Sequence, residues 1–294
     1  MQTGFFEQFF SSRALQFLVK SIDLALEEDG EDLTSRGLFR ESDKLQALIV
    51  AKENCILAGL PLIELILSRT GTETSRYRVS NFGREGAKVQ ANTRIAAIEG
   101  SALAILKSER VILNYLSHLS GIATLTNSFV QELSDSVSKI TDTRKTLPGL
   151  RYPEKYAVLV GGGQNHRLDL QEMIMLKDNH IDRAGGISLA VNKIRENCQP
   201  CPPIEVECRN EADVEEAIAC GVDRIMLDNM EKSEIGPVLA KIPREIETEI
   251  SGGVSQDNIR EIGKLGADYI SCGFLTHSAG SVDLSMQLFN GETH

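Results

Sequence analysis

Residues 204–251 read IEVECRNEADVEEAIACGVDRIMLDNMEKSEIGPVLAKIPREIETEIS, and this stretch decides the fold. Three short apolar runs rich in β-formers lie in it, at 204–207, 224–228 and 248–251. Between these runs, residues 211–220 and 231–241 have the apolar spacing of amphipathic helices. A strand followed by a helix and a further strand is typical of parallel βαβ units. The stretch therefore predicts an α/β fold.

The same alternation continues on both sides of this stretch. Further β-rich runs lie at 139–142, 173–177 and 269–272, and further helical patterns lie at 187–197 and 255–265. Five of the runs end in a polar or small residue, namely Lys177, Glu207, Asp228, Ser251 and Cys272. The steps from Glu207 to Cys272 are 21, 23 and 21 residues, which is about one strand plus one helix each.

This regular spacing predicts a TIM-like α/β barrel, complete or incomplete, whose strand ends meet at one rim. In such barrels the catalytic residues collect at the carboxyl-terminal rim. A charged side chain in the middle of a strand costs free energy, whereas one at the mouth of a barrel can face a ligand. The alternative interpretation is that these polar residues are only solvated strand ends.

The first part of the chain has a different pattern, which predicts a small α+β domain. A helix is expected at 11–28 and another at 60–68, and the strand-like runs lie at 45–51, 55–58 and 88–99. Residues 101–133 are long and periodic, and we expect one or two helices there that lead into the barrel. The expected division is therefore an N-terminal domain over 1–115 and a barrel domain over 116–280, with a tail at 281–294 that can return to the first domain.

The composition excludes some classes of partner. The 294 residues include 31 Lys and Arg against 42 Asp and Glu, so the formal net charge is −11. Nucleic acids and anionic membranes require a basic surface, and neither is expected as the main partner. No run approaches the roughly 20 apolar residues of a membrane span, and the N-terminus lacks signal-peptide features. We therefore expect a cytoplasmic protein.

Six cysteines are present, and in a reducing compartment they are expected as thiols rather than disulfides. Cys198 and Cys201 form a C-x-x-C pair, with Cys208 nearby. A zinc or redox site would need a second ligand pair or a thioredoxin-like setting, and the sequence contains neither. Metal or redox chemistry at this pair is therefore the less favoured interpretation.

Several basic residues follow the predicted strands. Arg144 and Lys145 leave the first barrel strand, His166 and Arg167 end a loop that begins with three glycines, and Lys177 ends the next strand. Such a cluster repels itself unless an anion binds it, so on an acidic protein it predicts a polyanion site. Each residue taken alone is equally consistent with a surface cation, and His166 alone with a structural role.

Two small-residue turns and two carboxylates complete the predicted site. Ser251, Gly252 and Gly253 follow one strand, and the helix expected from residue 255 would bring backbone N–H groups towards a phosphate. Cys272 and Gly273 form a second such turn one strand later, and paired turns of this kind bind phosphate in barrel enzymes. Glu207 and Asp228 end neighbouring strands and could bind Mg²⁺, or could pair with the lysines.

These segments resemble the quinolinate phosphoribosyltransferases (nicotinate-nucleotide pyrophosphorylase, carboxylating), which are type II phosphoribosyltransferases. The resemblance covers nearly the whole chain, and its motifs are highly specific in combination. The matching segments are 58–61, 109–110, 119–124, 142–151, 161–167, 177–180, 204–207, 226–229 and 251–253. Glu249 and Cys272 depart from the expected pattern.

The resemblance implies an enzyme of NAD biosynthesis. It would transfer the phosphoribosyl group of 5-phosphoribosyl-1-pyrophosphate to quinolinate with loss of CO₂, and it would need Mg²⁺ but no organic cofactor. It also implies a homodimer or larger homo-oligomer whose active sites are shared, with Arg110 donated by the neighbouring subunit.

The resemblance also assigns roles to residues. Lys145, Glu207 and Asp228 would be catalytic, and the two acids would bind the metal ion. The expected pocket for quinolinate and the donor comprises Thr143, Arg144, Lys145, His166, Arg167 and Lys177. The expected cradle for the 5′-phosphate comprises Ser251, Gly252, Gly253, Cys272 and Gly273.

Three alternatives stay open at this point. A related transferase could act on nicotinate without decarboxylation, although several cations suit a dicarboxylate better. A more distant relative from metal-transport operons could act on another substrate. The chain could also be a phosphate-binding barrel without activity, although simple anion binding would not favour two acids at the rim.

Overall fold

The computed structural model describes residues 3–70 and 77–289. The chain divides into two compact units, which we describe separately. The first comprises residues 1–127, 146–162 and 278–294, and the second comprises 128–145 and 163–277. The division lies within a single long helix, α5 (Ala102–Glu132), and not at the expected position between residues 115 and 116.

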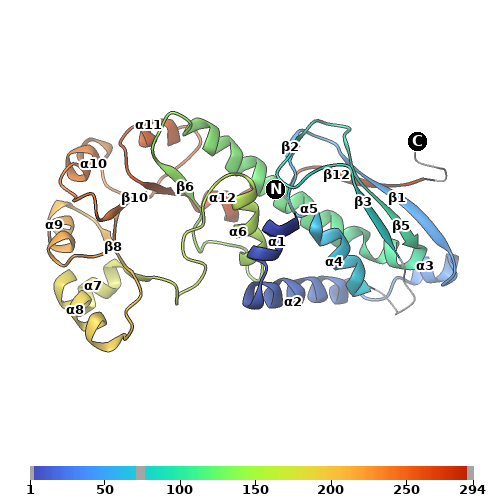
Figure 1. The fold of residues 1–294 in the computed structure, drawn as a ribbon, viewed down its shortest axis with the longest axis horizontal. Helices are drawn as coiled ribbons and strands as arrows, with labels where there is room; N and C mark the ends of the chain where they lie inside the picture. The colour runs from blue at the N-terminus through green and yellow to red at the C-terminus, as the bar shows by residue number, and fades with distance from the viewer. Residues whose placement is uncertain (1–2, 71–76, 290–294) are drawn as a thin grey trace. The chain divides into compact units, whose positions relative to one another are not determined.

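The first unit is built on an antiparallel sheet in the order β12-β1-β5-β3. Its strands are β1 (Lys44–Ala51), β3 (Arg78–Asn81), β5 (Arg94–Ser101) and β12 (Leu284–Phe289). A separate pair comprises β2 (Cys55–Ile56) and β4 (Lys88–Val89). Because β12 pairs with β1, the end of the described chain is part of the first unit (Figure 1).

Helices complete the first unit. They are α1 (Thr3–Phe9), α2 (Ser12–Glu28), α3 (Leu33–Leu38), α4 (Pro61–Thr70), most of α5, and α6 (Arg151–Val160). The helices expected at 11–28 and 60–68 are thus confirmed within two residues at each end. The prediction of a single strand at 88–99 is wrong, because this segment contains two strands, β4 and β5. A turn that includes Asn92, whose φ is 67°, separates β4 from β5.

The second unit contains the predicted parallel sheet. Its strands are β6 (Lys139–Thr141), β7 (Ile174–Leu176), β8 (Ile204–Cys208), β9 (Arg224–Asp228), β10 (Glu247–Ser251) and β11 (Tyr269–Ser271). They are paired in the order β6-β11-β10-β9-β8-β7, which is the cyclic order of a barrel opened between β6 and β7. The predicted α/β barrel architecture is therefore present, in its incomplete form.

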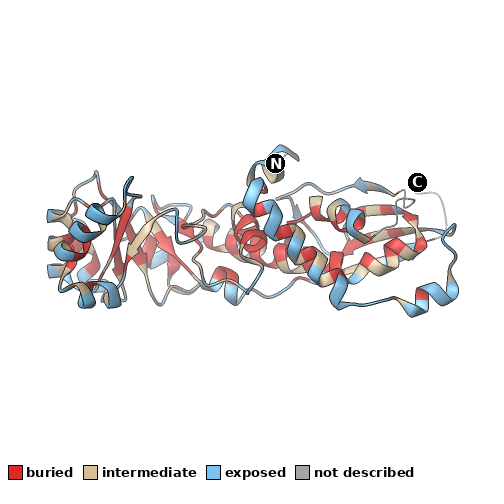
Figure 2. Ribbon diagram, turned by 90° about the horizontal axis from the view of Figure 1, so that it is seen from below, coloured by how far each residue is buried: buried red, intermediate tan, exposed pale blue. Residues whose placement is uncertain are grey.

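Helices follow these strands on the outside of the sheet. They are α7 (Asp178–Ala184), α8 (Ile187–Asn197), α9 (Glu211–Ala219), α10 (Lys232–Leu239), α11 (Ile259–Gly263) and α12 (Phe274–His277). Figure 2 shows buried residues along the strands and exposed residues on the outer helix faces. No helix in the described ranges is both long and apolar enough to cross a membrane.

The helix expected at 255–265 is shorter than predicted. Only Ile259–Gly263 is helical, because the Asn258 side chain holds the preceding residues in a turn. Its Oδ1 accepts from the backbone N–H of Ser255, and its Nδ2 donates to the Gly253 carbonyl. The predicted helix N-terminus therefore does not lie at the Ser251–Gly253 turn.

Candidate active site

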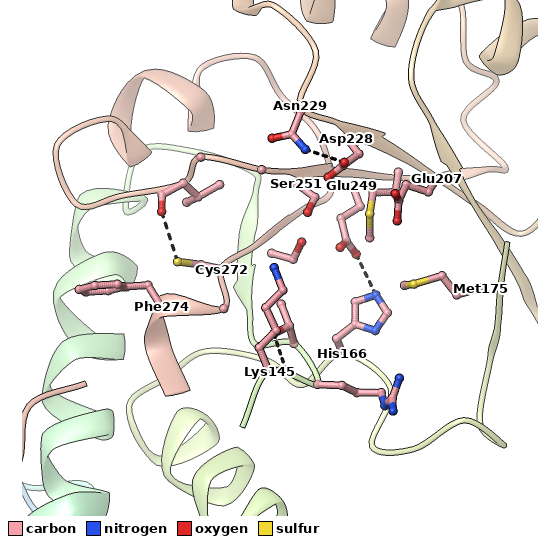
Figure 3. A pocket seen from close by; sticks show the side chains of 18 of the residues that line it. Lys145, His166, Met175, Glu207, Asp228, Asn229, Glu249, Ser251, Cys272 and Phe274 are labelled. Carbon is pink, nitrogen blue, oxygen red and sulfur yellow. Dashed lines mark hydrogen bonds and ion pairs between the residues drawn. The ribbon is translucent and has the colours of Figure 1, made fainter. Parts of the chain in front are cut away.

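A cavity of about 710 Å³ lies at the carboxyl-terminal rim of the parallel sheet, entirely within the second unit. Every predicted site residue except Arg110 lines it. These residues are Thr143, Arg144, Lys145, His166, Arg167, Lys177, Glu207, Asp228, Ser251, Gly252, Gly253, Cys272 and Gly273. They meet because the carboxyl ends of parallel strands lie along one edge. Figure 3 shows part of this lining.

The loop that carries His166 and Arg167 is fixed by a buried carboxylate, Asp142. Its Oδ1 accepts from the backbone N–H of His166 at 3.0 Å, and its Oδ2 accepts from Nδ2 of Asn165 at 2.6 Å. The backbone N–H of Gln164 also donates to the carbonyl of Ile140 in β6. The loop is thus attached to the strand next to the opening of the barrel.

The His166 ring faces the interior of the second unit. Its Nδ1 accepts from the backbone N–H of Arg167 at 2.8 Å, and its Nε2 lies 3.0 Å from Glu205 and 3.4 Å from Glu249. The ring is 5% exposed. Because Nδ1 accepts a hydrogen bond from the backbone, Nε2 is the ring nitrogen that faces the two carboxyls.

Glu205 and Glu249 lie against the His166 ring, and we call these two carboxyls the floor of the site. Figure 3 shows the contact between Glu249 and His166. Both glutamates are fully buried, and burial is the main cause that raises the pKa of each carboxyl to about 7. The guanidinium of Arg224 lies 3.3 Å from Glu249. His166, Glu205 and Glu249 have the spacing of a group that could hold a metal ion, since one ligand atom from each lies within 4.8 Å of the others. The guanidinium of Arg224 already supplies positive charge beside Glu249.

Sequence reasoning missed these two floor residues, although a signal for them was present. Side chains two positions apart on a strand point to the same face. Glu205 therefore lies on the same face as Glu207, one step below the rim, and Glu249 lies likewise below Ser251. A glutamate one step inside a predicted barrel strand indicates a buried polar cluster.

The basic side of the cavity contains Arg144, Lys145, Arg167 and Lys177. Arg167 is nearly buried, and its Nη1 donates to the Met173 carbonyl at 2.7 Å. Burial and then the neighbouring Arg144 lower the pKa of Arg167. A guanidinium group whose pKa is lowered by a second guanidinium beside it is suited to an anion bound between the two.

Each rim carboxylate has one oxygen engaged by a neighbour. Lys177 Nζ lies 2.9 Å from Glu207 Oε2, so the lysine pairing considered from the sequence is present. Asn229 Nδ2 donates to Asp228 Oδ2 at 2.6 Å. The other oxygen of each carboxylate is not committed to that partner. Two partly exposed carboxylates on adjacent strands suit Mg²⁺, which binds proteins through few carboxylates and keeps several waters.

The two small-residue turns differ in their construction. Gly252 and Gly253 have φ values of 94° and 61°, which favour glycine, and turns of this kind are suited to binding anions through backbone N–H groups. Gly273 lets the Lys145 side chain pass close by, because a Cβ there would lie 3.0 Å from Lys145 Cδ. The Cys272 thiol is buried 3.6 Å from the Val254 carbonyl, and burial raises its pKa.

Arg110 is the one predicted site residue that does not line this cavity. It lies on α5 in the first unit and lines another cavity, of about 830 Å³, within that unit. Apolar side chains reach solvent at this cavity, with Phe17 41% and Leu24 65% exposed.

Comparison with known families covers nearly the whole chain. Residues 32–120 match the family described as quinolinate phosphoribosyl transferase, N-terminal domain. Residues 122–287 match the family described as quinolinate phosphoribosyl transferase, C-terminal domain.

Individual proteins are similar over most of their length. A probable nicotinate-nucleotide pyrophosphorylase [carboxylating] of Bacillus subtilis is 42% identical over 87% of this chain and 88% of its own. A quinolinate phosphoribosyltransferase [decarboxylating] of Nicotiana tabacum is 37% identical over 91% of this chain and 81% of its own. The crystal structure of NadC from Streptococcus pyogenes matches with a TM-score of 0.88 and 38% identity, over 95% of this chain and 98% of that one.

Proposed function

Since the chain belongs to the quinolinate phosphoribosyltransferase family, we propose that the cavity in its second unit binds quinolinate beside 5-phosphoribosyl-1-pyrophosphate. The enzyme transfers the phosphoribosyl group to the pyridine nitrogen and releases pyrophosphate and CO₂, which gives nicotinate mononucleotide for NAD biosynthesis. The observation that carries the site assignment is the meeting of four cations and two rim carboxylates in one cavity.

The cations suit the acceptor. Arg144 and Arg167 are the guanidinium groups of the cavity, and guanidinium binds a carboxylate through two parallel hydrogen bonds. Quinolinate has two adjacent carboxylates, so two such groups match it better than they match nicotinate, which has one. His166 supports this pocket through its contacts rather than through charge, because its ring nitrogens face the floor and the backbone.

The donor end is assigned to the part of the cavity that carries the two rim acids and the glycine turn. The left-handed turn at Gly252 and Gly253 is suited to the 5′-phosphate, and Glu207 and Asp228 to the ribose and Mg²⁺. When bound, the metal ion supplies positive charge for the departing pyrophosphate. Lys145 extends past Gly273 into the same space and adds a second cation there.

The reaction then follows from positioning and charge. The bond between C1 of the ribose and the pyrophosphate oxygen breaks while the pyridine nitrogen approaches C1, and the acids stabilise the positive charge that develops on the ribose. The nitrogen becomes quaternary and can accept the electron pair of the adjacent C–CO₂⁻ bond. CO₂ leaves, and a proton takes its place on the ring.

We further propose that the site is completed by a second copy of the chain. Arg110 is an exposed cation beside the exposed Phe17 and Leu24, and exposed apolar groups around a cavity favour contact with another protein. A partner's cavity is the natural acceptor for the guanidinium of Arg110.

The six cysteines are free thiols, which supports a reducing, cytoplasmic location.

An assay with purified enzyme tests this function. Product and CO₂ are expected only when quinolinate, the donor and Mg²⁺ are all present, and Glu207→Ala should lower kcat/KM by about 10²-fold. Equal turnover of nicotinate would contradict the dicarboxylate assignment. Tight binding of the donor without any turnover would favour the inactive phosphate-binding barrel.

A further inference from the structure

Asn229 stands at the rim of the cavity, directly after Asp228 at the end of β9. Its φ is 53°, in the left-handed region that residues with a side chain rarely adopt. Within the described ranges, the other non-glycine residues of this kind are Ser12 and Asn92, and neither lines this cavity. Such a conformation persists only where neighbouring groups hold it, and it often marks a functional site.

Three contacts hold Asn229 between two parts of the site. Its backbone N–H donates to the Ser251 carbonyl at 3.1 Å, which extends the pairing of Asp228 with Ser251. Its side-chain Nδ2 donates to Asp228 Oδ2 at 2.6 Å (Figure 3). The other side of its amide lies against Gly252, where an added Cβ would come within 2.6 Å of Asn229 Cγ.

We propose that Asn229 is a positioning residue that holds the Asp228 carboxylate and the Ser251–Gly253 turn in one fixed arrangement for the phosphoribosyl donor. The proposal rests on the donor site assigned above. The amide occupies one oxygen of Asp228 and so fixes the rotation of the carboxylate, which leaves its second oxygen for the ribose or the metal ion. The same amide packs on the turn assigned to the 5′-phosphate, so both ends of the ribose 5-phosphate meet one rigid unit.

A purely conformational role is the competing explanation. Asparagine tolerates the left-handed region better than most residues, so Asn229 could serve only to turn the chain after β9. Glycine separates the two explanations, because it adopts this φ without strain but has no amide. If only the turn matters, Asn229→Gly should bind ligands normally. If the amide positions Asp228, the same variant should fold normally and bind the donor poorly.

The probe is ribose 5-phosphate, titrated by calorimetry into the full-length enzyme without added metal. Asn229→Gly should weaken its affinity by about tenfold to a hundredfold, the usual effect of removing a group that orients a ligating side chain. The affinity of this variant for quinolinate alone should stay at the wild-type level. Its melting temperature should stay at the wild-type level or rise. Asn92→Gly is the matched control, because Asn92 has a φ of 67° in the first unit, and it should leave both affinities unchanged.

A double-mutant cycle shows whether Asn229 acts through Asp228. In an Asp228→Ala background, Asn229→Gly should have little further effect on ribose 5-phosphate binding, because the carboxylate it orients is gone. Unchanged binding by Asn229→Gly, or additive losses in the cycle, would overturn the positioning role. Failure of the wild-type enzyme to bind ribose 5-phosphate would instead overturn the donor-site assignment, and the positioning role with it.

Discussion

Glu205 and Glu249 are the residues whose placement most changes the picture of the site. Both are fully buried beneath the rim, where they flank the His166 ring. Two carboxyls in such surroundings do not both ionise readily, because burial disfavours the charged form of each and the charge of Glu205 further raises the pKa of Glu249. Their contacts with Nε2 hold the His166 ring towards the interior of the second unit.

The raised pKa of Glu249 predicts a specific dependence of stability on pH. Its pKa in the folded protein lies at about 7, above the ordinary value of 4.5, mainly because of burial. Between these values the folded state binds more protons than the unfolded state, so the free energy of unfolding falls as the pH rises through this window. The slope is at most about 1.4 kcal/mol per pH unit for each proton.

Glu249→Gln tests this dependence. The neutral amide removes one titrating group, so the fall in stability from pH 5 to pH 8 should be smaller than in wild type. Urea unfolding at several pH values measures the slope. Glu245→Gln, which changes an exposed glutamate just before the same strand, is the control and should keep the wild-type slope. An unchanged slope in Glu249→Gln would show that the buried carboxyl does not titrate in this range.

At the scale of elements, β12 shows how the end of the described chain stabilises the first unit. It forms an outer strand of the β12-β1-β5-β3 sheet, and its burial decreases from Leu284 to Leu288. Leu284 is 8% exposed, whereas Leu288 on the same face is 50% exposed. The strand is therefore attached to the core chiefly at its beginning.

This gradient predicts unequal effects of the same substitution. Leu284→Ala should lower the free energy of unfolding by about 2–4 kcal/mol, because it removes a buried side chain. Leu288→Ala should change it by no more than about 0.5 kcal/mol, as exposed substitutions do. Thermal and urea unfolding of both variants measure the difference. Equal losses would mean that β12 is buried along its whole length.

At the scale of the whole molecule, the charges are strongly uneven. The chain has a net charge of −11, yet one cavity gathers two arginines and two lysines. The remaining predicted cation, Arg110, lies in the other unit at a cavity with exposed apolar side chains. A protein with this arrangement is suited to small anions rather than to nucleic acid.

Complementation tests whether two chains share each active site. Arg110→Ala and Lys145→Ala should each be nearly inactive, because the proposed function gives each of these cations a contact with a substrate. After subunit exchange, part of the activity should return, since one of the two hybrid sites receives both wild-type residues. No recovery, with heterodimers confirmed by mass spectrometry, would exclude a shared site.

The sequence by itself determined the alternation of strands and helices and the residues that collect at the rim. Both follow from local rules, because apolar spacing sets each element and the ends of parallel strands necessarily meet at one edge. Glu207, Asp228 and Ser251 could therefore be predicted to meet, and all three line the cavity. The same rules could not set the ends of α11, which depend on two hydrogen bonds from the side chain of Asn258.

Only the tertiary structure decided how these side chains are used. The inward-facing ring of His166, the pairing of Lys177 with Glu207 and the position of Asn229 against Gly252 all depend on contacts between different strands and loops. No pattern along the chain specifies such contacts, since they arise from the register of β8, β9 and β10 and from the path of the loop beside β6. The physical reason is that a side chain's charge and orientation are set by the groups that surround it in space, and folding brings those groups together from distant parts of the sequence.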